Sequence, residues 1–565
     1  MKSSFSILIL FLLSIGLPVH SRVTLDKSTD NPVISINGKP MIILGGETGN
    51  SAATSNEDIE DVLEKAAILN LNTVLIPAYW DLIEPYEGKF DFSLIDKVIN
   101  TAHEKDLKIV FLWFGAWKNS MSCYAPQWVK KDTQRFPRAR TSSGKPLEIL
   151  SAFSSEVADA DLKAFRELVN HIKLTDKDNT VIMIQVENEI GMLEEPRDFA
   201  PQASAEFEKG VPAELMNYLI ANKKNLHPSL LEKWNNNGGK TEGTWYEVFG
   251  NDIYTDEYFM AWNYANYVEK LAKMVKENID LPLYVNAALN SRGRVPGEYP
   301  SAGPLAHLKD FWKAGAPSID FLSPDIYDTG FRNWVKQYHF ADNILFIPEA
   351  KRDLNNGAQA YYVFGHHKAL GFSPFSFENG NMEYDASISS AYSLLRELMP
   401  YLNGEIKTEY SEGLLFDNKN KDSVFIDDST RITFSHFFTL PWDPRAADID
   451  NWPETGAIFI KLAPDEYLLA GNGVVAKFED VSENINKENL GEDGFLLADS
   501  KRTTKIDKGH TPRVGLASVE EVKINPDGSL TRIRSFNGDE THQGRHARIG
   551  VDDHKILHIR TYRYQ

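Results

Sequence analysis

Short apolar runs recur along roughly the first 400 residues, and most of them stop at a polar or aromatic side chain. The clearest run, residues 181–185, leads directly into Val186-Glu187-Asn188-Glu189-Ile190-Gly191. A run this short and rich in β-branched residues indicates a strand buried on both faces. A second run, residues 343–349, has the same form and stops at Glu349. The pattern therefore places acidic side chains at the carboxyl ends of two buried strands.

Other apolar runs alternate with segments in which apolar residues recur at helical spacing. The runs lie at residues 41–47, 73–76, 107–112, 283–286, 319–322 and 371–378, and the helical segments include residues 59–68, 94–102 and 162–172. Strands that alternate with helices predict parallel βα units. With the two runs above, the strand count reaches the number that closes a barrel. The sequence thus predicts an α/β fold, a TIM (β/α)8 barrel.

The pattern changes near residue 402, where short alternating strands separated by Gly, Pro and Asp turns replace the βα units. Such strands are typical of a β-sandwich. We predict a barrel over residues 22–401, with an insertion near 192–253, and an all-β sandwich domain over 402–565. The insertion is too long for an ordinary connection, and it either lies on the active face or projects away from it. The sandwich either binds sugar or packs against the barrel, and we favour packing.

Charge and the N-terminal segment narrow the function classes. The formal net charge of −20 leaves no basic excess to neutralise phosphates, so no nucleic-acid partner is expected. Residues 1–21 combine a positive charge, a short apolar core and a small residue, which is typical of a secretory signal peptide. A membrane anchor is the alternative, but the run is shorter than the ~20 apolar residues of a spanning helix. We expect a periplasmic or secreted protein with no membrane span after signal removal.

Two carboxyl groups at strand ends fit the cleavage of glycosidic bonds. In a parallel barrel, the carboxyl ends of the strands form the active face. One acid must protonate the leaving oxygen and one carboxylate must meet the developing oxocarbenium ion, and we assign these roles to Glu189 and Glu349. The partner would be an oligosaccharide or polysaccharide, and no cofactor is expected. The sequence shows no Cys/His cluster with zinc spacing and no phosphate-binding glycine loop, so no metal is expected either.

Polar and aromatic side chains at other strand ends are expected to bind the substrate. They are Asn188, Tyr327, Glu47, Tyr79, Trp113 and Asn286. The amide of Asn188 would hydrogen-bond a sugar hydroxyl next to the reacting carbon. The phenol of Tyr327 would donate to Glu349 and keep that carboxylate ionised and oriented. The aromatic rings of Tyr79 and Trp113 would stack on sugar rings, or else pack in the core.

Other acidic residues compete for the catalytic roles. Glu187 and Glu189 point to the same side of an ideal strand, so spacing alone does not choose between them. Glu47 and Glu378 also end predicted strands. A lone Glu after a strand is otherwise a solvated loop residue. From the pattern alone, the pair of Glu189 and Glu349 is therefore one hypothesis among these alternatives.

The segment Gln185-Val186-Glu187-Asn188-Glu189-Ile190-Gly191 closely resembles the acid/base motif of glycoside hydrolase family 35, the β-galactosidases. In that motif the Glu after Asn is the acid/base, which corresponds to Glu189. Residues 79–92 resemble the family's segment after the second strand, partly shared with family 42, and residues 125–129 resemble its Leu-Pro-x-Trp-Leu element. Glu349 matches the nucleophile position of the wider clan of retaining barrel glycosidases. The resemblance covers roughly residues 33–400 and implies a retaining exo-β-galactosidase.

The sequence departs from this family at positions expected to contact galactose. Residues 112–117 read Leu-Trp-Phe-Gly-Ala-Trp, followed by Lys118-Asn119-Ser120, where the family has Arg-Pro-Gly-Pro-Tyr and an Ala-Glu-Trp element. The family's sugar-contacting Tyr on the second strand aligns with Pro77. These departures bear on sugar specificity more than on the reaction. A β-glucosidase, an arabinosidase or an endo-glycanase of the same clan is one alternative, and a non-catalytic glycan-binding protein is another.

Overall fold

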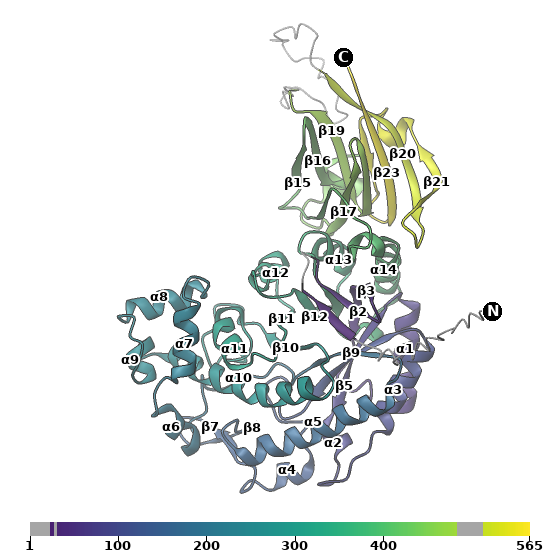
Figure 1. Cartoon of the computed structure of the whole chain (residues 1–565). Coiled ribbons are helices and arrows are strands. Elements are labelled where there is room, and N and C mark those ends of the chain that lie inside the picture. The colour runs from purple at the N-terminus through teal and green to yellow at the C-terminus, as the bar shows by residue number, and fades with distance from the viewer. Residues whose placement is uncertain (1–22, 28–30, 483–511) are drawn as a thin grey trace, which may run out of the picture.

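The computed structural model of the chain describes residues 23–27, 31–482 and 512–565 (Figure 1). The signal peptide predicted for residues 1–21 lies outside the described residues. Within the described ranges, no helix combines the length and the apolar character needed to cross a lipid bilayer.

Eight parallel strands close into a barrel. They are β4 (Ile43–Glu47), β5 (Thr73–Tyr79), β6 (Lys108–Phe114), β9 (Val181–Gln185), β10 (Leu283–Ala288), β11 (Phe321–Ile326), β12 (Phe346–Ala350) and β13 (Gly371–Pro374). Around the ring they follow chain order, and the last strand pairs with the first. Chain order around a closed parallel ring is the (β/α)8 topology. The predicted TIM barrel is confirmed.

Helices cover the outside of the barrel between successive strands. They are α1 (Asn56–Ile68), α2 (Trp80–Ile83), α3 (Ser93–Glu104), α4 (Gln127–Lys131), α5 (Ser155–Thr175), α10 (Ile253–Asn278), α11 (Lys309–Gly315), α12 (Phe331–Tyr338), α13 (Asn356–Gly365) and α14 (Met382–Leu402). In α1, the side chains of Ile59, Val62 and Leu63 are buried at helical spacing. The Ser55 hydroxyl caps that helix by accepting from the Asp58 backbone N–H at 3.1 Å. The predicted periodicity is thus the buried face of the helix.

Smaller elements decorate the barrel. An antiparallel sheet precedes it, formed by β1 (Val23–Asp26), β2 (Val33–Ile36) and β3 (Lys39–Met41), and a hairpin after β6 holds β7 (Arg138–Arg140) and β8 (Pro146–Leu150). The segment between β9 and α10 forms α6 (Pro201–Phe207), α7 (Ala213–Ala221), α8 (Pro228–Asn236) and α9 (Trp245–Phe249). Figure 1 shows α7, α8 and α9 grouped at the side of the barrel. Trp234 and Trp245 are buried, so they serve a local core and offer no open surface to a sugar.

Two antiparallel sheets follow α14, as predicted for the C-terminal part. The six-stranded sheet has the order β14 (Tyr410–Phe416), β17 (Thr455–Ala463), β18 (Glu466–Asn472), β23 (Lys555–Tyr564), β20 (Arg513–Ile524) and β21 (Leu530–Phe536). The four-stranded sheet has the order β15 (Asp422–Asp427), β16 (Thr430–His436), β19 (Val474–Asp480) and β22 (His546–Arg548). Phe434, Phe459 and Ile559 belong to the apolar core that the two sheets share.

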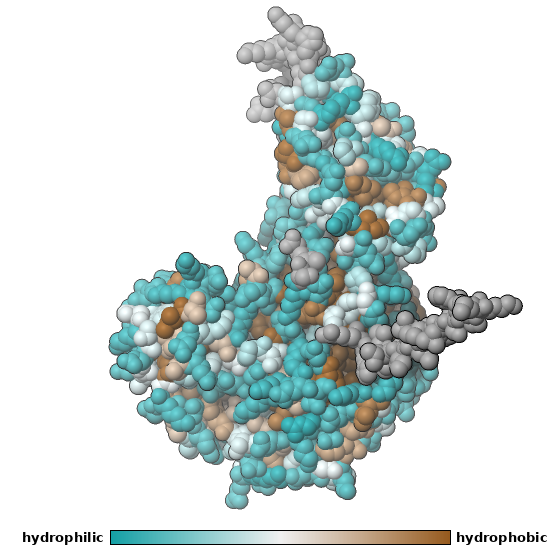
Figure 2. Space-filling view, viewed as in Figure 1, coloured by the Kyte–Doolittle hydropathy of each residue, from teal (hydrophilic) through white to brown (hydrophobic). Residues whose placement is uncertain are grey.

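The six-stranded sheet packs on α13 and α14 of the barrel (Figure 1). Ile458, Ile460 and Leu468 of this sheet belong to the same apolar cluster as the barrel core. Gly365 and Gly413 lie at the contact, where a Cβ on Gly365 would come within 2.5 Å of the Gly413 Cα. Figure 2 shows that hydrophilic residues cover most of the visible face of both parts. The sheet therefore supports the barrel from the side of α13 and α14.

Candidate active site

The carboxyl ends of the barrel strands bring five polar side chains together. Glu47 ends β4, Asn286 lies in β10, Asp325 in β11 and Glu349 in β12, while Glu189 follows β9. Asp325 and Glu349 are register partners in neighbouring strands. All five side chains are buried. The topology thus gathers, at one end of the barrel, residues that are far apart in the sequence.

Glu189 and Glu349, the predicted pair, face each other within this site. Together with Asp325, they place carboxylate oxygens within 4.8 Å of one another. Carboxyl groups of retaining glycosidases lie about 5–5.5 Å apart, whereas inverting enzymes leave about 6.5–9.5 Å for a water molecule. The short separation of the pair therefore fits a double displacement.

Glu189 is held through both its backbone and its side chain. Its backbone N–H donates to Asn286 Oδ1 at 3.0 Å, and its Oε2 accepts a hydrogen bond from the Asn119 side-chain amide. Burial, followed by the charge of Glu349, raises the pKa of Glu189 to about 7, while Lys118 acts in the opposite direction. A carboxyl group with a pKa near neutrality can both give and take a proton at neutral pH, as a general acid/base needs.

Glu349 is oriented by Tyr327, as the neighbouring strand ends predicted. The Tyr327 hydroxyl donates a hydrogen bond to Oε1 of Glu349. The other carboxylate oxygen, Oε2, is buried and has no hydrogen-bond partner among the described residues. A carboxylate fixed through one oxygen keeps the second available for attack on carbon. Tyr327 is 41% exposed, so a residue that contacts Glu349 reaches the protein surface.

The chain turns immediately after β9, where the two candidate acids stand. Glu187 and Glu189 both adopt left-handed backbone conformations, with φ angles of 59° and 44°. Such conformations cost non-glycine residues about 1 kcal/mol or more and are concentrated at functional sites. The turn ends the period-two geometry of the strand. The two Glu side chains therefore need not share a side, which resolves the ambiguity left by spacing.

Glu187 lies in a separate, closed pocket beside Asp161 of α5. Its Oε2 accepts from the Trp117 backbone N–H at 2.8 Å. Asp161 accepts from the Trp113 indole N–H at 2.8 Å and from the Tyr267 hydroxyl at 2.7 Å. Burial and the charge of Asp161 raise the pKa of Glu187 well above its usual range. Glu187 is thus the protonated partner of a buried carboxyl pair, and it does not face Glu349.

Trp113 and Tyr79 do not present stacking surfaces to a sugar, so these two substrate-binding predictions are corrected. Trp113 is fully buried, and its indole ring stacks on Phe165 of α5. Tyr79 is also buried, and its hydroxyl donates to the Asn50 backbone oxygen at 2.9 Å. Large aromatic side chains contribute most to stability when they are buried. At these strand ends the two rings pack beneath the loops. A sequence pattern alone does not distinguish such a buried ring from an exposed ring that stacks on a sugar.

The loop after β6 contributes Lys118 and Asn119, which lie in the segment that departs from the family's galactose-contacting elements and to which no individual role was assigned from the sequence. Lys118 is buried, and its Nζ donates to Asn188 Oδ1 at 2.9 Å. The amide nitrogen of Asn188 is buried and unpartnered among the described residues. Asn188 therefore keeps a donor for a sugar hydroxyl. The available signal was the polar run Lys118-Asn119-Ser120 close behind a predicted strand end.

Glu47 is fully buried beside the nucleophile candidate. Neither of its carboxylate oxygens has a donor among the described residues. Burial, followed by the charge of Glu349, raises the pKa of Glu47 well above its usual range, and the two carboxyl groups are close enough for a proton on Glu47 to form a hydrogen bond between them. A protonated Glu47 can donate to Glu349. The strand-end acid predicted to bind substrate thus also contacts the nucleophile candidate.

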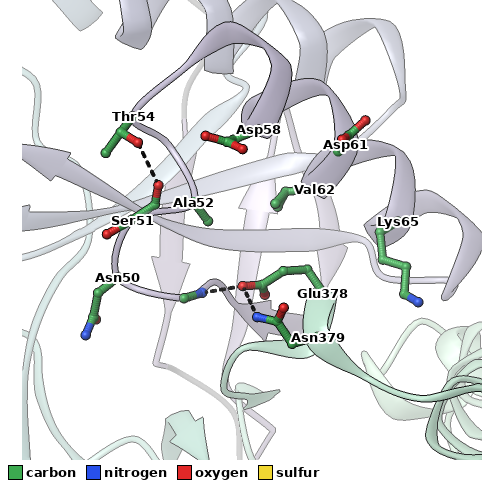
Figure 3. A pocket seen from close by; sticks show the side chains of 11 residues that line it. Asn50, Ser51, Ala52, Thr54, Asp58, Asp61, Val62, Lys65, Glu378 and Asn379 are labelled. Carbon is green, nitrogen blue, oxygen red and sulfur yellow. Dashed lines mark hydrogen bonds between the residues drawn. The ribbon is translucent and has the colours of Figure 1, made fainter.

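A cavity of about 610 Å³ lies between the loop after β4 and the segment after β13. Figure 3 shows Glu378 and Asn379 on one side of it. The Oε1 of Glu378 accepts from the Gly49 backbone N–H at 2.9 Å and from the Asn379 amide at 3.0 Å. Glu378, the remaining strand-end acid, is therefore engaged with these loops. Glu378 lines this cavity, and neither Glu189 nor Glu349 does.

A (β/α)8 barrel with two close, buried Glu residues at the carboxyl ends of its strands has the arrangement of a retaining barrel glycosidase. Residues 33–237 match the family model of Glycosyl hydrolases family 35. Residues 388–548 match a Domain of unknown function (DUF5597). The chain thus carries a glycosyl hydrolase family 35 domain, and the resemblance seen in residues 185–191 is confirmed.

Solved structures similar to this chain include three β-galactosidases. The enzyme of the psychrophilic Marinomonas ef1 is 12% identical with a TM-score of 0.42, and the match covers 63% of this chain and 60% of that one. The enzyme of Bacillus circulans sp. alkalophilus is 14% identical (TM-score 0.42; 64% and 57% covered), and that of Rahnella sp. R3 is 16% identical (TM-score 0.44; 66% and 58%). The matched part spans less than two thirds of each protein, and likeness at this level carries no argument about activity. No curated protein matches the chain.

Proposed function

We propose that this protein is a retaining exo-glycoside hydrolase, a β-galactosidase that removes terminal β-linked galactose from oligo- or polysaccharides. The proposal is carried by the carboxylate oxygens of Glu189 and Glu349, which lie within 4.8 Å of each other at the strand ends. The family 35 domain supports the choice of a glycoside substrate. The resemblance of the acid/base motif to that of the β-galactosidases supports the choice of galactose.

The reaction has two steps. In the first, Glu349 attacks the anomeric carbon while Glu189 gives its proton to the glycosidic oxygen, so the carbon–oxygen bond to the leaving group breaks and a glycosyl-enzyme ester forms. In the second, Glu189, now ionised, takes a proton from water, whose oxygen attacks the same carbon and releases Glu349. Two inversions leave the anomeric configuration of the sugar unchanged. Tyr327 orients the nucleophile throughout.

A different sugar specificity within the same reaction is the second candidate. Lys118 contacts Asn188, and Asn119 contacts Glu189. These two residues stand in the segment where the sequence departs from the family's galactose-contacting elements. Polar contacts to a single hydroxyl discriminate strongly between related substrates, because a mismatched sugar leaves buried polar groups unpaired. A β-glucosidase or an arabinosidase is therefore the alternative.

The signal peptide predicted from residues 1–21 supports a periplasmic or secreted location for this activity. Fractionation of cells that express the full chain tests it. Activity in the periplasmic or culture fraction, with an N-terminus beginning after about residue 21, is the expected result. Activity confined to the cytoplasm with an intact N-terminus would contradict it.

A panel of aryl β-glycosides tests the proposed function. We expect the wild-type protein to hydrolyse the β-galactoside faster than the β-glucoside or the α-arabinoside. Proton NMR during early turnover should show the β-anomer as the first product. Preference for another sugar would select the second candidate, and a first product with inverted configuration would contradict double displacement. Binding of glycans without any product over long incubation would favour a non-catalytic glycan-binding protein.

A further inference from the structure

The two-step mechanism leaves Asp325 without a role, although this residue lies close to both reacting groups. Its side chain is buried, and it is the register partner of Glu349 in the neighbouring strand. Its carboxyl group also lies close enough to that of Glu189 for a proton on Asp325 to form a hydrogen bond between them. Carboxylate oxygens of all three residues lie within 4.8 Å of one another. Three ionised carboxylates at this separation would repel one another strongly inside a protein.

The hydrogen bonds of Asn286 fix what each oxygen of Asp325 can do. Asn286 Oδ1 accepts from the Glu189 backbone N–H at 3.0 Å, and this N–H can only donate, so the orientation of the amide is settled. Asn286 Nδ2 then donates to Asp325 Oδ2 at 2.6 Å. The other oxygen, Asp325 Oδ1, is buried without a donor among the described residues. Asp325 therefore accepts a hydrogen bond through Oδ2 and, if it is protonated on Oδ1, can donate one hydrogen bond from that oxygen.

The elements packed around Asp325 face it mainly with acids and phenols. These are Glu47 from β4, Glu189 after β9, Tyr284 from β10, Tyr327 after β11, Tyr338 from α12 and Glu349 from β12. Lys118 acts on Glu47 and Glu189. Burial, followed by the charges of Glu349 and Glu189, raises the pKa of Asp325 well above its usual range. The surroundings therefore favour the neutral acid.

We propose that Asp325 is a positioning residue that works as a protonated carboxylic acid, accepting from Asn286 through Oδ2 and donating from Oδ1 to Glu189. The inference rests on the proposed glycosidase function. The donated hydrogen bond stabilises the ionised form of Glu189 and lowers its pKa from the higher value that burial alone would give. It also fixes the carboxyl plane of Glu189 toward the leaving oxygen. Asp325 keeps its proton in both steps, and no bond to it forms or breaks.

Two matched substitutions distinguish a protonated acid from an ionised one. Asparagine supplies one acceptor and one donor in the same shape, so Asp325→Asn should keep kcat within a few-fold of wild type and leave the pH profile unchanged. Asp325→Ala removes the donor. Its kcat should fall by about 10²-fold, the cost of a misplaced reacting group. The alkaline limb of its kcat/KM profile should move to higher pH, because Glu189 loses a bond that favours ionisation.

Three outcomes would overturn the proposal. Asp325→Asn that is as inactive as Glu349→Gln would show that Asp325 acts as a charged group. Restoration of an inactive Asp325→Asn variant by an added divalent cation would show that Asp325 is an ionised metal ligand. Asp325→Ala that retains both the wild-type rate and the wild-type pH profile would show that Asp325 positions nothing. Circular dichroism and thermal melting of both variants distinguish these results from a failure to fold.

Infrared difference spectroscopy tests the protonation of Asp325 without any substrate. At pH 7, wild type minus Asp325→Asn should show the carbonyl stretch of a protonated carboxylic acid, with Glu47→Gln as the control for the neighbouring protonated acid. A spectrum with only a carboxylate band would contradict the proposal. If the wild type hydrolyses no glycoside, the proposed function fails, but this band still decides the state of Asp325.

Discussion

Two pairs of carboxyl groups each include one Glu of the turn after β9, and they differ in what surrounds them. The pair of Glu187 and Asp161 is enclosed: indole, phenol and backbone donors occupy three of its four oxygens, and the fourth, Glu187 Oε1, is buried without a donor among the described residues. The pair of Glu189 and Glu349 keeps a buried oxygen without a partner, beside the partly exposed Tyr327. Both pairs include an acid with a raised pKa. Neither a perturbed pKa nor an unpartnered carboxylate oxygen therefore identifies a reacting group unless the group is also accessible.

The closed pair also depends on a glycine. A Cβ on Gly115 would lie 2.8 Å from Asp161 Oδ1 and 2.8 Å from Glu187 Oε1. Only glycine lets the backbone pass so close to both carboxyl groups. The closed pair thus ties the turn after β9 to α5 and the loop after β6. This tie holds the left-handed turn that sends Glu189 toward Glu349.

The same substitution at the two Glu residues gives the largest expected contrast. Glu349→Gln should lower kcat by roughly 10⁴-fold or more, because a nucleophile of covalent catalysis is lost. Glu187→Gln should leave kcat within a few-fold of wild type, because an amide can accept from Trp117 and donate to Asp161 as the protonated acid does. Steady-state hydrolysis of an aryl β-galactoside measures both. Equal losses of kcat in the two variants, both folded, would show that the two carboxyl pairs do not differ in function.

Substitution of the acid/base should depend on the leaving group. Glu189→Gln should lose about 10²–10⁴-fold with a poor leaving group, because proton transfer is lost, and much less with a dinitrophenolate, which leaves without a proton. In the wild type, kcat/KM should decline as pH rises through about 7, since the acid form of Glu189 is then lost. In Glu189→Gln this decline should be absent. A decline that persists unchanged would assign it to another group.

Removal of the phenol from Tyr327 should have a smaller effect. Tyr327→Phe deletes the donor to Glu349 Oε1 and keeps the ring. The loss of one positioned hydrogen bond to a reacting oxygen costs about 10²-fold in kcat. Tyr392→Phe is the control, because that buried hydroxyl donates only to the backbone oxygens of Gly45 and Phe372. Comparable losses in the two variants would show that the effect of Tyr327 is structural.

The smallest effect concerns stability at the closed pair. The raised pKa of Glu187 means that the folded state holds a proton that the unfolded state releases above the ordinary Glu value of 4.5. The stability contribution of Glu187 is therefore greatest at acid pH and declines as pH rises. Glu187→Gln should remove this decline, so its free energy of unfolding relative to wild type should improve from pH 5 toward pH 9. Denaturant titrations at several pH values measure this. If the free energies of unfolding of the two proteins changed in parallel with pH, the raised pKa of Glu187 would be contradicted.

Much of the fold could be predicted from the sequence, because buried parallel strands are continuous apolar runs and helices repeat at their own period. The positions of Glu189, Glu349 and Tyr327 at strand ends correctly predicted that these three residues are neighbours in space. The aromatic residues Trp113 and Tyr79 could not be placed, since a buried ring and a sugar platform have the same one-dimensional pattern. The contacts of Asp325 and Lys118 also escaped, because they depend on register between strands and on the course of a loop.

Trapping of the glycosyl-enzyme tests the central claim most directly. A 2-deoxy-2-fluoro-β-galactoside with a good leaving group should inactivate the protein with one sugar attached per chain. Digestion and tandem mass spectrometry should place that sugar on Glu349, and Glu187→Gln should be labelled at the same position. A sugar attached to any other carboxyl group, or steady turnover of this substrate with no adduct and an inverted product, would contradict the account.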